Sequence, residues 1–250
     1  MIIDTHCHAG DFSPLFKGDH RPDDLRAAHE EAHVDAGIMS ILVRDDMARG
    51  NDATHEATRR HPGQIYGHAY LNPHDVPAAL AELERCHELG GFVGVKLHPS
   101  EDAWFPYLEQ YFPIYHRLEE LGWPALFHSG TSPHSSPLTI AYAALQFPRI
   151  PFILGHFGLS DLSWECFPAA ALADNVYVDT TANPMVRVMS EWIDRFGADR
   201  MLWGSDFPFY NVQYELDKLA VLTTSSEDRD RIAGLNAQRI YGLPGAGGPS

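Results

Sequence analysis

A regular alternation of short β-rich runs with longer segments of helical period constrains the fold of this chain more than any other feature. The runs that read as strands lie at residues 1–6, 36–43, 64–71, 92–98, 124–129, 150–156, 175–181 and 200–206. The predicted helices lie near 23–36, 52–61, 76–89, 107–121, 138–147, 165–174, 185–196, 213–223 and 227–240. Strands that alternate with helices form right-handed βαβ units and therefore a parallel sheet.

Eight such units close naturally into a (β/α)8 TIM barrel, and 250 residues is a typical length for this single domain. An open, doubly wound α/β sheet is the competing architecture. That fold carries a glycine-rich phosphate-binding turn after its first strand, whereas this chain has THCHAG there. We therefore predict one barrel over residues 1–242. The Gly- and Pro-rich residues 243–250 are predicted to form a disordered tail.

Composition and charge exclude several classes of protein. With 44% hydrophobic and 21% charged residues, and no apolar run near the roughly 18 residues that span a bilayer, the chain has no predicted membrane segment. Met1 leads directly into an apolar strand without a basic segment or cleavage site, which predicts a cytoplasmic protein. A net charge of −16 disfavours nucleic acid and anionic membranes as partners. A small-molecule substrate is the expected partner, and a homo-oligomer is left open.

The predicted strands end in an unusual set of side chains. The first ends in His6 and His8, which share one face of an extended chain with Asp4. The fourth ends in Lys96 and His98, the fifth in His128, the sixth in His156 and the eighth in Asp206. In a (β/α)8 barrel these strand ends surround one mouth, where catalytic residues lie. The convergence of imidazoles and a carboxylate there predicts a metal site.

Neutral imidazoles and a carboxylate suit Zn²⁺ and neighbouring divalent ions, and we favour one ion over two. A bound ion lowers the pKa of its water from about 15.7 towards 7 and polarises a carbonyl group. Asp206 can then ligate the ion and accept the proton of the water, and His156 can protonate or polarise the substrate. Asp4 is either a support for a ligand histidine or a buried polar strut. Asp179 is assigned to the outer face of its strand and to a structural role.

Five segments, DTHCH, GVKLHP, FHSG, GHFG and WGSDFP, together resemble the amidohydrolase superfamily, and specifically its amidohydrolase-2 branch of metal-dependent hydrolases and related decarboxylases. The resemblance extends from residue 3 to about 242 and includes the closing NAQRIYGL. It implies that His6, His8, His128 and Asp206 are metal ligands. It also implies that His156 is catalytic or a further ligand.

Lys96 leaves two interpretations open. Binuclear members of the superfamily, such as dihydroorotase and phosphotriesterase, bridge two metal ions with a carbamylated lysine on the fourth strand, and VKLHP is similar to the dihydroorotase segment. The alternative, which we favour, is an unmodified Lys96 that orients an anionic substrate or pairs with a neighbouring acid. His98 then contacts the substrate or the rim of the mouth rather than a metal ion.

The leading functional hypothesis is a hydrolase that attacks an amide, ester or lactone of a small molecule with metal-activated water. The alternative is a decarboxylase of an aromatic or unsaturated carboxylic acid, in which the ion chelates the carboxylate and a neighbouring oxygen. A TatD-like nuclease and a non-catalytic metal-binding barrel are less favoured, since Lys96 replaces the acidic residue of the nucleases and the net charge disfavours DNA. The loop at 9–24 is expected to cover the mouth, and Arg44, Phe157 and Phe207 are expected to contact substrate.

Overall fold

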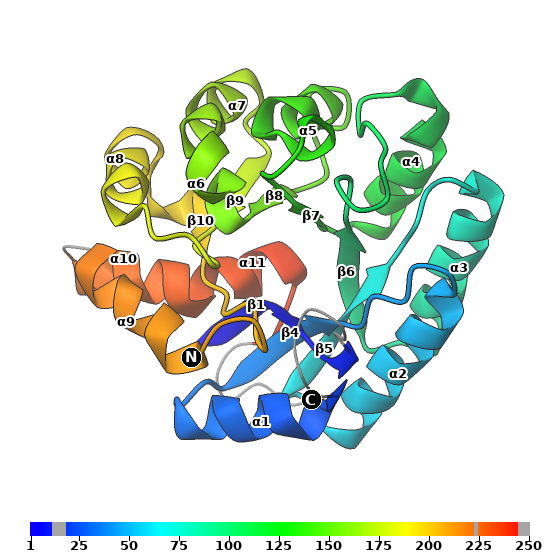
Figure 1. Cartoon of the computed structure of the whole chain (residues 1–250), viewed down its shortest axis with the longest axis horizontal. Helices are drawn as coiled ribbons and strands as arrows, with labels where there is room; N and C mark the ends of the chain where they lie inside the picture. The colour runs from blue at the N-terminus through cyan, green and yellow to red at the C-terminus, as the bar shows by residue number, and fades with distance from the viewer. Residues whose placement is uncertain (12–18, 223–224, 245–250) are drawn as a thin grey trace.

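The computed structural model describes residues 1–11, 19–222 and 225–244. Within these ranges, eight strands form one sheet in the order β1-β4-β5-β6-β7-β8-β9-β10, and neighbouring strands in this order are parallel. Helices surround the sheet on the outside (Figure 1). The predicted single-domain (β/α)8 barrel is therefore confirmed.

The strands of the barrel are β1 (Ile3–His8), β4 (Ala36–Ser40), β5 (Ile65–Tyr70), β6 (Phe92–Leu97), β7 (Ala125–His128), β8 (Phe152–Gly155), β9 (Val176–Asp179) and β10 (Met201–Leu202). The α-helices are α1 (Pro22–Glu31), α2 (Met47–Arg60), α3 (Val76–Leu89), α4 (Phe112–Leu121), α5 (Pro137–Ala144), α6 (Leu159–Leu162), α7 (Cys166–Leu172), α8 (Val186–Phe196), α9 (Val212–Leu222), α10 (Ser226–Asp230) and α11 (Asn236–Tyr241). The remaining helical turns are η1 (Glu109–Tyr111), η2 (Pro133–Ser135), η3 (His156–Gly158), η4 (Ser163–Glu165), η5 (Ala198–Arg200) and the π-helical η6 (Arg231–Leu235).

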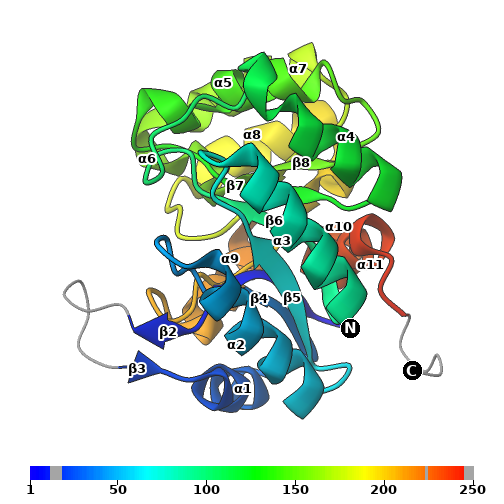
Figure 2. The same ribbon diagram turned by 90° about the vertical axis from the view of Figure 1, so that its right-hand side faces the viewer.

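A small antiparallel hairpin of β2 (Gly10–Asp11) and β3 (Asp19–His20) follows β1. It lies at one end of the barrel, while the N-terminus and α11 lie at the other (Figure 2). Because the chain enters the hairpin from the end of β1, the hairpin marks the carboxyl end of the barrel. The hairpin belongs to the loop predicted to cover the mouth, but residues 12–18 of that loop lie outside the described residues.

The barrel closes between its first and last strands through backbone hydrogen bonds. The eighth predicted strand is shorter than expected, since β10 ends at Leu202. The chain beyond it nevertheless stays beside β1. The amide of Thr5 donates to the carbonyl of Trp203 at 3.1 Å, and the amide of Asp206 donates to the carbonyl of His6 at 2.7 Å. Residues near the two ends of the chain are thereby held side by side at the mouth.

A β-bulge interrupts β1 just before its two histidines. Between Asp4 and Cys7, β1 advances by three residues while β4 advances by two. The bulge breaks the alternation of faces on which our prediction for Asp4 depended. The Asp4 carboxylate contacts His29 of α1, on the outer side of the strand, whereas His6 faces the mouth. The prediction that Asp4 and His6 share one face is therefore wrong.

Apolar side chains fill the amino end of the barrel interior and leave the carboxyl end to polar ones. This floor consists of Ile3, Ile38, Leu126, Ile153, Leu202, Ala237, Ile240, Tyr241 and Leu243. Leu243, the first residue after the predicted boundary at 242, is buried there, and residues 245–250 of the predicted tail lie outside the described residues. A second, larger apolar layer lies between the sheet and the helices, as expected for parallel strands that are covered on both faces. None of the helices in the described ranges combines the length and the apolar composition that a membrane span requires.

Candidate metal centre

His6 occupies the centre of the mouth and is held at both ring nitrogens. Its Nδ1 lies 2.8 Å from Oδ2 of Asp179, and its Nε2 lies 2.6 Å from Nζ of Lys96. Burial, reinforced by the charge of Lys96, keeps the pKa of His6 well below its usual value, so the ring is neutral near pH 7. A neutral ring that donates from Nδ1 to a carboxylate presents the Nε2 lone pair to the mouth, as metal-ligating histidines do.

Asp179, at the end of β9, is part of this centre and not of the outer layer. Its Oδ1 accepts a hydrogen bond from the backbone amide of His156 at 2.7 Å. Our assignment of Asp179 to the outer face was wrong. Val176 and Val178 pack in the outer apolar layer, so the alternation of side chains turns Asp179 inward. The apolar alternation in VYVD was the sequence signal that could have revealed this.

The carboxylate of Asp206 lies among three imidazoles. It is 3.5 Å from Nε2 of His8, 3.9 Å from Nε2 of His6 and 4.0 Å from Nδ1 of His156. Burial raises the pKa of Asp206 above its ordinary value. Asp206 has a positive φ of 55°, an uncommon conformation for a residue other than glycine. Such outliers cluster at functional sites, where the surrounding structure enforces them.

Ligand atoms of His6, His156 and Asp206 all lie within 4.8 Å of one another, close enough to share one ion. Nδ1 of His156 is buried and has no hydrogen-bond partner among the residues described. Burial and the neighbouring imidazoles keep the pKa of His156 well below its usual value, so its ring is neutral. A buried lone pair without a donor is expensive in a folded protein, and a metal ion would satisfy it. The donor set therefore fits a divalent metal.

Two further imidazoles continue the ring of histidines around the mouth. The ring centroid of His128 lies 4.6 Å from that of His156 and 4.1 Å from that of His98, against which it stacks. Burial lowers the pKa of His128 to about 3 and the pKa of His98 well below its usual value. The structure therefore brings both predicted residues to the mouth as neutral side chains.

Lys96 is buried at the centre of the mouth, where it contacts His6. Burial lowers its pKa to about 8, although the carboxylates of Asp206 and Asp179 act in the opposite direction. Lys96 is therefore largely cationic at neutral pH. Lys96 is a buried positive charge beside neutral imidazoles and the carboxylates of Asp206 and Asp179, and its ammonium can pair with an anionic substrate.

The remaining predicted contacts divide into residues at the mouth and one in the core. Arg44 forms an ion pair with Glu101. The backbone carbonyl of Phe207 accepts a hydrogen bond from the amide of His8 at 2.7 Å, so Phe207 adjoins the site. Phe157 is fully buried and packs against Trp192 of α8 in the outer layer. The prediction that Phe157 contacts substrate is corrected, because the turn after β8 directs its ring outward.

Sequence reasoning also missed the residue that orients His8. Nδ1 of His8 lies 3.0 Å from Oγ and 3.2 Å from the carbonyl oxygen of Ser40, at the end of β4. When Nδ1 donates to these oxygens, the lone pair of Nε2 faces Asp206. A serine at a strand end carries no sequence signal for this role.

A (β/α)8 barrel with histidines from several strands and an aspartate after the last one defines the amidohydrolase class of enzymes. The family model described as Amidohydrolase matches residues 3–243, and the chain therefore belongs to this family. A gamma-resorcylate decarboxylase from Rhizobium radiobacter is 27% identical over 79% of this chain and 76% of its own length.

Solved structures share the fold. A 2,6-dihydroxybenzoate decarboxylase complexed with 2,6-dihydroxybenzoate has a TM-score of 0.81 and 20% identity, over 97% of this chain and 99% of its own. A dihydroxybenzoic acid decarboxylase from Polaromonas sp. JS666, with bound manganese and the inhibitor 2-nitroresorcinol, has a TM-score of 0.80 and 20% identity, over 98% of each chain.

Proposed function

We propose that this protein is a metal-dependent decarboxylase of a hydroxylated aromatic carboxylic acid of the 2,6-dihydroxybenzoate type. The observation that carries the proposal is the similarity to a gamma-resorcylate decarboxylase over most of both chains. The buried cation of Lys96 beside neutral imidazoles supports it, because such a pocket favours a carboxylate substrate over a neutral amide or lactone. We therefore prefer the decarboxylase alternative to our leading hydrolase hypothesis.

The proposed metal ligands are the predicted His6, His8, His128 and Asp206, with His156, whose unpartnered Nδ1 lies in the same cluster, as a further ligand. When bound, a divalent ion would supply Lewis acidity to the substrate carboxylate and a neighbouring hydroxyl oxygen. The donor set of imidazole nitrogens and one carboxylate suits Zn²⁺, and the manganese in a structural neighbour makes Mn²⁺ the second ion to test. One ion is proposed, with Lys96 unmodified.

Lys96 is proposed to bind the substrate anion. Its ammonium now donates to Nε2 of His6, and the same lone pair is required for metal ligation. The ammonium must therefore leave this nitrogen when His6 becomes a ligand. It is then free to pair with a substrate anion in the mouth. In a buried site, charge pairing with a carboxylate or phenolate is stronger than in water.

Asp206 is proposed to deliver the proton that the reaction needs. Decarboxylation of an arene breaks the bond between the ring carbon and the carboxyl carbon and forms a C–H bond in its place. A proton first adds to that ring carbon, and the electron pair of the broken bond then restores the aromatic ring as CO2 leaves. Burial raises the pKa of Asp206, which favours a proton on this carboxyl group, whereas burial lowers the pKa of His156, so that its ring rarely carries the extra proton that it would have to donate.

The test is to incubate the purified protein, loaded with Mn²⁺ or Zn²⁺, with 2,6-dihydroxybenzoate and separately with a sugar lactone. We expect release of CO2 and 1,3-dihydroxybenzene in equal amounts, and no opening of the lactone. The Asp206→Asn variant should be slower by about 10²- to 10⁴-fold, the usual contribution of a positioned acid. His87→Gln, at an exposed histidine of α3, is the matched control and should retain the wild-type rate. Lactone opening without release of CO2 would contradict the proposal.

A further inference from the structure

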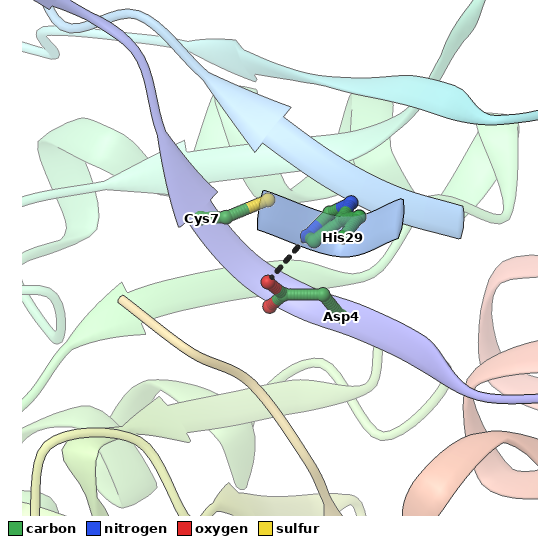
Figure 3. Close-up of side chains that lie close together, drawn as sticks. All are labelled: Asp4, Cys7 and His29. Carbon is green, nitrogen blue, oxygen red and sulfur yellow. Dashed lines mark hydrogen bonds and ion pairs between the residues drawn. The ribbon is translucent and has the colours of Figure 1, made fainter. Parts of the chain in front are cut away.

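A second group of metal-ligating residue types lies behind the mouth. Asp4, Cys7 and His29 are all buried, and ligand atoms of the three lie within 4.8 Å of one another. Figure 3 shows Asp4 and Cys7 of β1 turned toward His29 of α1, with a hydrogen bond between the Asp4 carboxylate and the His29 ring. The proposed reaction does not use this group.

The hydrogen bonds of Asp4 argue against a metal ion in this group. An ionised carboxylate has about four acceptor positions. At Asp4, Oδ1 accepts from the amides of His6 (3.2 Å) and Ser205 (2.9 Å). Oδ2 accepts from Nε2 of His29 (3.0 Å) and Oγ of Ser205 (2.5 Å). All four positions are therefore filled by protein donors.

Cys7 does not offer a thiolate ligand either. Its thiol donates to the carbonyl of Ile38 at 3.4 Å. Burial, with a further contribution from Asp4, raises the pKa of Cys7 well above its ordinary value, so the thiol stays protonated. Asp4 and Cys7 are thus engaged in hydrogen bonds within the protein, and the group needs an explanation other than metal binding.

Three of the four hydrogen bonds to Asp4 come from the segments that carry two proposed metal ligands. One is the backbone amide of His6 itself, and two belong to Ser205, which directly precedes Asp206. His6 and Asp206 lie near opposite ends of the chain, so Asp4 links their backbones across the point where the barrel closes. Asp206, the residue after Ser205, also has an uncommon positive φ of 55°.

His29 in turn fixes Asp4. Its Nε2 donates from α1, and its ring packs directly over Gly37 of β4. A Cβ at position 37 would lie 2.5 Å from Cε1 of His29, so the close approach of this ring requires a glycine. The side chain of Asp4 is thereby held from the outer layer of the barrel.

We infer that Asp4 is a positioning residue for the candidate metal site and that His29 positions Asp4. The inference rests on the proposed metal-dependent function. Two residues outside the mouth, Asp4 and His29, thereby help to set the distance between the ligands His6 and Asp206. Loss of the cluster therefore weakens metal binding in the folded protein, in addition to any loss of stability.

The experiment is calorimetric titration of the metal-free protein with Mn²⁺ and with Zn²⁺, which needs no substrate. Asp4→Asn should weaken the metal affinity by about 10- to 100-fold, the usual effect of removing a partner behind a metal ligand. His29→Ala should weaken it by about 10-fold, and His29→Gln, whose amide N–H replaces the Nε2–H donor, should restore most of the loss.

The matched control is Asn236→Ala, which removes buried hydrogen bonds to the carbonyls of Ala198 (2.8 Å) and Met201 (2.7 Å) at the foot of the barrel. It should lower the unfolding midpoint without changing the metal affinity. If the wild type binds neither ion, the proposed function fails. If the wild type binds and the folded Asp4 and His29 variants bind equally well, the positioning inference is overturned. Should Asp4→Asn not fold, Ser205→Ala decides: affinity about 10-fold weaker supports the inference, and unchanged affinity refutes it.

Discussion

Glu215 should make the protein less stable as the pH rises towards neutrality. This residue of α9 is fully buried, with Oε2 2.5 Å from Nζ of Lys218 and 3.2 Å from the amide nitrogen of Ala182. Burial raises its pKa from 4.5 to about 7, although the charge and hydrogen bond of Lys218 act in the opposite direction. The folded protein therefore retains a proton on Glu215 at pH values where the unfolded chain has lost it.

The sign and size of the effect follow from proton linkage. Below about pH 4.5 the carboxyl group is protonated in both states, and its ionisation costs the folded state nothing. Between about pH 4.5 and 7 only the unfolded chain ionises, so the free energy of unfolding falls as pH rises. Above about pH 7 the loss is complete and amounts to about 3 kcal/mol, because each pKa unit corresponds to about 1.4 kcal/mol.

The assay compares wild type and Glu215→Gln by urea denaturation of metal-free protein at several pH values from 4.5 to 8. The glutamine cannot ionise, so the stability of the variant relative to wild type should increase by about 3 kcal/mol over this range. Other buried carboxyl groups contribute to both proteins and cancel in the difference.

Glu82→Gln is the matched control for Glu215→Gln. Burial opposes ionisation of Glu82 as well, but hydrogen bonds from Arg85 and Asn51 outweigh it and leave the pKa of Glu82 lowered. This variant should show no such gain between pH 4.5 and 8. A stability difference between wild type and Glu215→Gln that does not change with pH would refute the reasoning.

Three further outcomes are expected. Asp179→Asn should weaken metal affinity by about 10- to 100-fold, because an amide that donates to Nδ1 of His6 moves the ring proton to the nitrogen that must ligate; ¹⁵N NMR of the ring would report that tautomer. Gly204→Ala should destabilise the fold by about 1–3 kcal/mol in thermal unfolding, because its Cβ would lie 2.7 Å from Oγ1 of Thr181 and 2.8 Å from Cβ of His6. The three cysteines are buried with raised thiol pKa values, so a thiol reagent should react with them only after unfolding, and rapid labelling of native protein would contradict this.

The barrel was predictable because its signal is repeated along the chain. Each βα unit repeats the same pattern, and an error in one boundary leaves the architecture unchanged. The eighth strand was overpredicted, because the residues after Leu202 keep a strand-like pairing with β1 without regular sheet geometry. The predicted C-terminal helix is interrupted by the π-helical turn η6, which hydrophobic period alone does not reveal.

The site was predictable where its residues end strands, and not where backbone irregularities change their direction. His6, His8 and Lys96 follow from their strand-end positions, and the structure places them together at the mouth. The direction of Asp4 depends on a β-bulge, which shifts pairing between strands that are far apart in sequence. The position of Phe157 depends on a turn in which its φ is 47°, and the residue types in HFG do not predict this backbone conformation.

The location of the site on the barrel has a consequence for how the site forms. His6 lies on the first strand and Asp206 follows the last, so their meeting requires that the barrel has closed. Because contacts between residues about 200 positions apart must overcome the entropy of closing a long loop, we expect them to form late in folding. Metal binding should therefore stabilise the closed barrel and not an isolated half of it. Asp4 accepts hydrogen bonds from both segments, so it links closure of the barrel to the distance between the two proposed ligands.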